Sequence, residues 1–206
     1  MNEEIQQRVK DIKLSFRQMM DGATAQSMRQ KGLDYHLNWG ATLPRLQEKA
    51  SELGKDYHLA IALWKENVRE CKILATMIMP AEDMLPEVVD IWMEQTDSIE
   101  IAEQAAFNLY QHLPYAAEKA FQWIASSSDM QQVCGFHVLS RLFMQKKEPN
   151  ERGISEFLDQ AQCALQGESL LVRKAAMQSV IRFAELGLVY ERVARSAMKQ
   201  IGMDFL

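Results

Sequence analysis

Two carboxylates, three positions apart, are the first residues of this chain that could do chemistry together. They stand in the stretch Asp97-Ser-Ile-Glu100. On a helix this spacing puts both side chains on one face, so both could project into a single cleft. The same spacing has the form of a capping box, in which the first side chain binds free N–H groups at the start of a helix. The sequence therefore leaves two interpretations open, a helix cap or a functional carboxylate pair.

Basic residues are the second group with a recognisable chemistry. Contacts to phosphate need Lys and Arg side chains together with helix N-terminal amides. The chain has a net charge of −5, which is a mild argument against non-specific nucleic-acid binding but leaves room for a local basic strip. The alternative is that these side chains form solvated helix faces paired with acids. The candidates are Arg45, Lys49, Arg69, Lys72, Arg141, Lys146, Lys147, Arg173, Lys174 and Arg182.

Other groups that bind metals or act as nucleophiles show no recognisable arrangement. The sequence contains no glycine-rich phosphate loop, nucleophile elbow or H-E-x-x-H motif. The four histidines have no metal-ligand spacing, so we expect no metal site. Cys71, Cys134 and Cys163 are far apart and in apolar helical register, which predicts buried thiols in a reducing compartment.

Short amphipathic helices must position all of these residues. Apolar residues recur at helical spacing, as in Ile99, Ala102, Ala106 and Leu109. The whole chain predicts about eleven or twelve such helices and no strand. Helices this short must stack side by side, and their pairs repeat at roughly 30–40 residues, as in HEAT-type repeats. The prediction is an all-α fold, a HEAT-like or ARM-like right-handed α-solenoid (an α-α superhelix), forming one domain over residues 1–206.

Local signals predict the helix ends and the environment of the tryptophans. Capping boxes are expected at 67–70, 97–100 and 128–131, Pro114 is expected to open a helix, and Ser169 to cap one. Trp39, Trp64, Trp92 and Trp123 occupy amphipathic positions and are expected in the core, with Trp39 and Trp92 the better candidates for exposure. No run reaches the roughly 18 apolar residues of a membrane span, and the N-terminus lacks an apolar signal region, so we expect a cytoplasmic protein.

Three stretches, taken in order and spacing, resemble the bacterial DNA alkylation repair family. They are Asn38-Trp-Gly-Ala-Thr-Leu-Pro-Arg45, Val68-Arg-Glu-Cys-Lys-Ile-Leu-Ala75, and the pair Asp97-Ser-Ile-Glu100 with Trp123-Ile-Ala-Ser126. The resemblance covers roughly residues 25–185. It implies a HEAT-like superhelix with a concave face for duplex DNA. It also implies excision of cationic alkylpurines by a DNA glycosylase that uses no metal and no organic cofactor.

In that family a carboxylate flanked by tryptophans offsets the cationic charge that develops as the glycosidic bond breaks. The resemblance places this carboxylate at Glu100, with Asp97 in support. Thr96 and Gln178 stand at the family's tryptophan positions, and Val133 stands where the family has an arginine. The expected phosphate contacts are Arg45, Arg141, Arg173, Lys174 and Arg182.

Two functions from different classes follow. The first is a protein of the DNA alkylation repair family that binds damaged duplex DNA, with excision of cationic alkylpurines as its further activity. The second is a non-catalytic α-solenoid that binds a protein partner in its concave groove. Neither interpretation requires a membrane, a metal or a cofactor.

Overall fold

The computed structural model describes residues 3–206, and the regular structure within that range is entirely helical. The all-α prediction is thereby confirmed. None of these helices combines the length and the apolar character that a membrane span needs. Short 3-10 turns, η1 (Ala81–Asp83) and η2 (Tyr110–His112), follow α5 and α7. The α-helices are α1 (Glu3–Gln18), α2 (Gly22–Gln30), α3 (Leu43–Leu53), α4 (Tyr57–Trp64), α5 (Arg69–Ile78), α6 (Pro86–Glu94), α7 (Ile99–Asn108), α8 (Ala116–Ile124), α9 (Asp129–Met144), α10 (Glu151–Gln166), α11 (Leu170–Ala184) and α12 (Leu188–Gln200).

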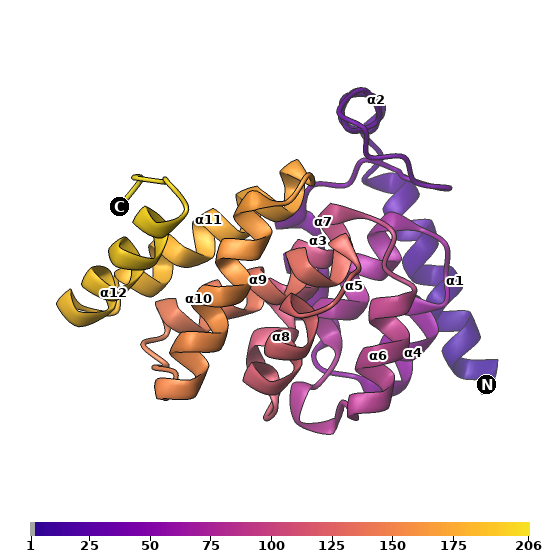
Figure 1. Cartoon of the computed structure of the whole chain (residues 1–206). Coiled ribbons are helices and arrows are strands. Elements are labelled where there is room, and N and C mark those ends of the chain that lie inside the picture. Colours follow the sequence, from indigo (N-terminus) through magenta and orange to yellow (C-terminus); the bar gives the residue numbers. More distant parts are fainter. Residues whose placement is uncertain (1–2) are drawn as a thin grey trace. The chain divides into compact units, whose positions relative to one another are not determined.

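The chain separates into two compact units. Unit 1 is Met1–Pro114 and unit 2 is Tyr115–Leu206. Helices α1 to α7 belong to unit 1, and α8 to α12 belong to unit 2 (Figure 1). Each unit has a core of its own, and the single domain over residues 1–206 stays a prediction.

Helix α5 lies at the centre of unit 1. It packs against α3, α4 and α7, and most of its residues are buried. Next to it, Trp64 of α4 stacks on Trp92 of α6, with ring centroids 4.0 Å apart and an interplanar angle of 2°. The first two residues of α5, Arg69 and Glu70, are charged and yet 1 % and 0 % exposed. Charges at that depth must be paired with neighbouring groups.

Helix α9 has the same central role in unit 2, where it packs against α8 and α11. Gly135 permits the close approach of α8, because a Cβ at this position would lie 2.9 Å from the carbonyl oxygen of Ala120. On the other side, Phe143 of α9 makes edge-to-face contacts with Phe157 and Phe183, at centroid distances of 5.1 and 5.4 Å. These contacts hold α11 with one face buried and the opposite face exposed.

The helix starts differ from the predicted ones. The capping boxes expected at 67–70, 97–100 and 128–131 are not formed. Glu70 and Glu100, the acids of the first two, bind tertiary partners instead, and Ser128 makes no side-chain cap bond. The cap at Ser169 is confirmed, since its side chain accepts a hydrogen bond from the N–H of Val172. Pro114 lies before the N-cap residue of α8 and does not open the helix. The N-cap residues of α5, α7 and α9, none of which makes a side-chain cap bond, are Val68, Ser98 and Ser128.

Candidate functional site

Glu100, in the first turn of α7, has a carboxylate whose two oxygens are both occupied. Its side chain is 15 % exposed. Arg69 donates through Nε to Oε2 at 2.8 Å and through Nη2 to Oε1 at 2.6 Å. The hydroxyl of Tyr35 donates to Oε2 at 2.5 Å. A bidentate guanidinium–carboxylate pair of this kind is among the strongest and most directional ion pairs in proteins.

Glu70 extends this pair into a buried network. Its Oε1 accepts hydrogen bonds from the N–H groups of Trp39 and Ala41 at 3.1 and 3.2 Å, and from Nη1 of Arg69 at 3.3 Å. Arg69 Nη1 also donates to the carbonyl of Ala41 at 2.9 Å. Oε2 of Glu70 has no hydrogen-bond partner among the described residues. Two carboxylates thus share one guanidinium, and together they hold the loop between α2 and α3 against α5 and α7.

The network determines the ionisation of its members. Burial alone would raise the pKa of Glu100, but hydrogen bonds from Arg69 and Tyr35, with the charge on Arg69, outweigh burial and lower this pKa. Burial and the hydrogen bond to Glu100 raise the pKa of the Tyr35 hydroxyl, which keeps it protonated as a donor. Glu100 is therefore an ionised carboxylate whose charge is already balanced by Arg69.

Asp97 does not join this network. The helix begins at Ile99, so Asp97 lies before its N-cap residue, is exposed, and shares no hydrogen bond with Glu100. The common helix face expected from the spacing of the two acids is not formed, because side chains three positions apart share a face only where both residues are helical. The structure brings Glu100 together with Arg69 and Tyr35 instead. The catalytic roles of Glu100 and Asp97 stay predictions.

The tryptophans are all buried. Trp39 is 9 % exposed and Trp92 is 2 % exposed, so neither of the two better candidates for exposure lies at the surface. Trp92 is covered by its stacking partner Trp64. Thr96, at one of the family's tryptophan positions, is also buried, and its hydroxyl donates to the carbonyl of Trp92 at 2.8 Å. No tryptophan side chain lies at the surface near Glu100 to stack on a base.

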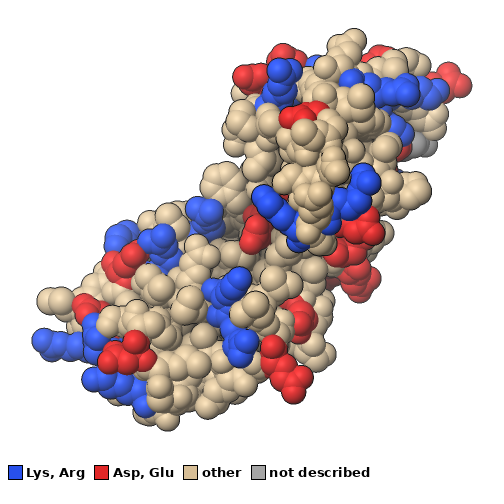
Figure 2. Space-filling view, turned by 90° about the horizontal axis from the view of Figure 1, so that it is seen from above, with Lys and Arg blue, Asp and Glu red and all other residues tan. Residues whose placement is uncertain are grey.

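Three of the five expected phosphate contacts lie on α11. Arg173 and Lys174 are exposed and form no ion pair with the described residues. Arg182 is engaged, since its Nη1 lies 2.9 and 2.7 Å from the two carboxylate oxygens of Glu185. Gln178 lies one turn after Lys174 and one turn before Arg182 on the same side of the helix. On the face drawn in Figure 2, basic and acidic side chains are interspersed.

The other two expected contacts lie elsewhere. Arg141 on α9 is half-buried, with Nη1 3.9 Å from Sδ of Met144. Arg45, in the first turn of α3, is exposed and forms no ion pair with any described residue. Arg69, also a candidate, is buried against Glu100 and is not available to a phosphate. The DNA-binding roles of the five residues stay predictions.

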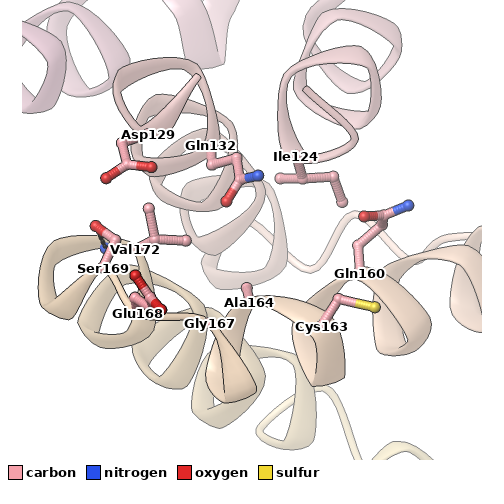
Figure 3. A pocket seen from close by; sticks show the side chains of 10 residues that line it. All are labelled: Ile124, Asp129, Gln132, Gln160, Cys163, Ala164, Gly167, Glu168, Ser169 and Val172. Carbon is pink, nitrogen blue, oxygen red and sulfur yellow. Dashed lines mark hydrogen bonds between the residues drawn. The ribbon is translucent and has the colours of Figure 1, made fainter. Parts of the chain in front are cut away.

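A cavity of about 520 Å³ lies in unit 2, among the end of α8, the start of α9, the end of α10 and the start of α11 (Figure 3). It was not expected from the sequence. Its apolar lining residues are Ile124, Ala164 and Val172, and no Lys or Arg lines it. The carboxylates of Asp129 and Glu168 in its lining would repel phosphate, which argues against a phosphate site here. Its other lining residues are Asp129, Gln132, Gln160, Cys163, Gly167, Glu168 and Ser169.

Possible metal ligands and the three cysteine thiols are further candidate site residues within residues 3–206. Within residues 3–206, no cluster of three or more His, Cys, Asp and Glu side chains is arranged to hold a metal ion. Cys71 and Cys134 are buried as expected, whereas Cys163 is exposed. Burial raises the pKa of the Cys71 and Cys134 thiols, which makes both poor nucleophiles.

The chain is similar to known proteins in both sequence and fold. The sequence matches the family model of the DNA alkylation repair enzyme over residues 12–184. The chain belongs to this family. A solved structure described as "a new family of proteins related to the HEAT-like repeat DNA glycosylases with affinity for branched DNA structures" has a TM-score of 0.84 at 16 % identity, covering 94 % of this chain and 83 % of that chain. This likeness confirms the HEAT-like α-solenoid fold class. No curated protein matches the chain in sequence.

The sequence indicated Glu100 as a candidate site residue but did not indicate its partners. Arg69 stands in the stretch Val68–Ala75 that carries part of the family resemblance, yet the sequence suggested exposure for it. No sequence pattern indicated Tyr35 as a site residue. The one available indication is that Arg69 opens a helix whose later residues are mostly apolar, because a charge on a buried helix must be paired with a carboxylate.

Proposed function

We propose that this chain binds DNA through its phosphates, with branched DNA as the preferred form, and does not excise bases. The observation that carries the proposal is the state of Glu100. Both of its oxygens are bound by Arg69 and Tyr35, so its negative charge is already offset. A carboxylate that assists glycosidic cleavage must instead direct its charge at the cation developing on the substrate.

Two further observations support binding without excision. The buried tryptophans leave no indole to hold a damaged nucleotide. By contrast, Arg45, Arg173 and Lys174 are exposed and unpaired with the described carboxylates, as residues that contact phosphate must be. Affinity for branched DNA is a property of the structural neighbour, and we extend it to this chain. The cytoplasm stays the proposed location.

Base release and DNA retention, measured on the same samples, test this proposal. A methylated duplex and a three-way junction of equal length are incubated with excess protein. We expect no alkylpurine release above the buffer control. In a gel mobility-shift assay, we expect the junction to give a shifted band. The paired variant Arg173→Gln/Lys174→Gln is expected to weaken the shift by roughly tenfold, since two phosphate contacts are lost. Release of alkylpurine that disappears in Glu100→Gln would overturn the non-catalytic part of the proposal.

A protein-binding scaffold is the second candidate, and one observation favours it. Helix α12 exposes apolar side chains, with Leu188 72 % and Val189 70 % exposed. A terminal helix of a repeat array normally turns a polar face outward. If neither DNA form is bound at low salt, this second function replaces the first.

A further inference from the structure

Helix α2 and the loop after it are held to unit 1 in an unusual way. Only Ala25 of α2 is buried, so apolar packing contributes little to its position. Figure 1 shows α2 at the edge of unit 1. The segment is anchored instead by polar contacts at its two ends. At the first end, the N–H of Asp21 donates to the carbonyl of Trp39 at 2.9 Å.

At the other end the anchor is the buried ion network. Tyr35 binds Glu100, and its hydroxyl also lies 2.7 Å from Oγ of Ser98. The N–H of Arg69 donates to the carbonyl of Leu37 at 3.0 Å. Buried ion pairs add little net stability compared with apolar residues of the same size, and their best-attested role is to select one arrangement. This network therefore serves to fix where α2 and its loop lie.

The segment held in this way is basic within an acidic chain. Residues 22–37 contain Arg29 and Lys31 but only one carboxylate, Asp34, a formal net charge of +1 against −5 for the whole chain. Arg29 and Lys31 are exposed and form no ion pair with the described residues. Three other cations of unit 1, Arg8, Lys13 and Lys49, are paired with carboxylates.

We propose that Gly22–Leu37 is a DNA-binding arm, whose Arg29 and Lys31 contact backbone phosphates, and that Glu100, Arg69 and Tyr35 are positioning residues for it. This inference rests on the proposed DNA binding and names one of its contact surfaces. The helix dipole also favours cations at the C-terminal end of α2. That effect concerns helix stability, whereas phosphate contact also changes DNA affinity and its salt dependence.

Arg29→Gln/Lys31→Gln separates these two effects. Its matched control is Lys10→Gln/Lys65→Gln, which removes two cations of unit 1 that are also exposed but lie outside the arm. Both proteins are titrated against a labelled three-way junction over a salt series. We expect the arm variant to bind roughly tenfold more weakly and its salt slope to fall by about 1.8, while the control keeps the wild-type values. Equal behaviour of the two variants overturns the arm.

Tyr35→Phe tests the positioning role. It removes the hydroxyl that reaches Glu100 and leaves the arm's charges and the Arg69–Glu100 pair in place. We expect faster amide exchange in residues 22–37 together with weaker junction binding. Wild-type binding by this variant, despite faster exchange, overturns positioning. If the wild-type protein itself binds no DNA, the proposed function fails first and the arm fails with it, so the two failures are distinguishable.

Discussion

At the residue scale, the decisive feature is that Glu100 has a partner of opposite charge inside the protein. Arg69 is 1 % exposed and its guanidinium is committed to Glu100, Glu70 and a backbone carbonyl. Removing one member of such a pair leaves the other buried without compensation. Stability measurements at this residue therefore report directly on its role.

Glu100→Ala is expected to lower the free energy of unfolding by about 3–5 kcal/mol, because it leaves Arg69 with only the already shared Glu70. Asp97→Ala is the control, since Asp97 is exposed and outside the network, and its effect should stay within about 0.5 kcal/mol. Chemical denaturation of the three proteins measures both values. Comparable small losses for the two variants would restore the capping-box interpretation.

The ionisation of Glu100 gives a second prediction at this scale. Its pKa is lowered in the folded protein, so its contribution to stability is complete above the ordinary pKa of about 4.3 and is lost as the pH falls through the lowered value. The difference in unfolding free energy between the wild type and Glu100→Gln should therefore be largest near neutral pH and shrink below about pH 4. Denaturant titrations at several pH values measure it. A difference that grows on acidification contradicts the ion pair.

At the element scale, the helices were predictable and their polar connections were not. The 3.6-residue spacing around Ile99, Ala102 and Ala106 is a property of the local sequence, and α7 forms there. The predicted capping boxes did not form because a glutamate can accept a hydrogen bond either from a backbone N–H at its own helix start or from a distant donor. In the folded chain, Glu70 and Glu100 accept from distant donors. The contact of Tyr35, Arg69 and Glu100 depends on tertiary packing, which single-sequence periodicity does not encode. The exposed Arg173 and Lys174 were identifiable because Val172, Ala175 and Ala176 mark the buried face of α11.

The loop that carries Tyr35 depends on one glycine. Gly40 has φ +74°, and a Cβ at this position would lie 2.2 Å from the carbonyl oxygen of Asp21. Gly40→Ala should therefore cost at least about 2 kcal/mol and detach the start of α2. Gly32 is the matched control, because its φ is +85° but nothing lies within 4 Å of its Cβ position. Gly32→Ala should cost only the backbone strain, about 1–2 kcal/mol. Equal losses at the two positions would show that the close contact does not matter.

At the scale of the whole molecule, an acidic chain presents a few cations that its own carboxylates leave unpaired. The net charge is −5, so the protein as a whole repels DNA at long range. Binding must then come from a small set of local contacts, for which we propose Arg29, Lys31 and Arg45 in unit 1 and Arg173 and Lys174 in unit 2. Each contact releases condensed counterions from the DNA when it forms.

The salt dependence of DNA affinity is the measurement that tests this account most directly. The dissociation constant for a three-way junction is measured between about 50 and 200 mM salt, with a straight duplex of equal length as the comparison. Five phosphate contacts predict that the logarithm of the binding constant falls linearly with the logarithm of salt concentration, with a slope of about −3 to −5. The proposed preference for branched DNA predicts tighter binding of the junction than of the duplex. A flat dependence, or no binding to either DNA at the lowest salt, would contradict phosphate-mediated DNA binding by this chain.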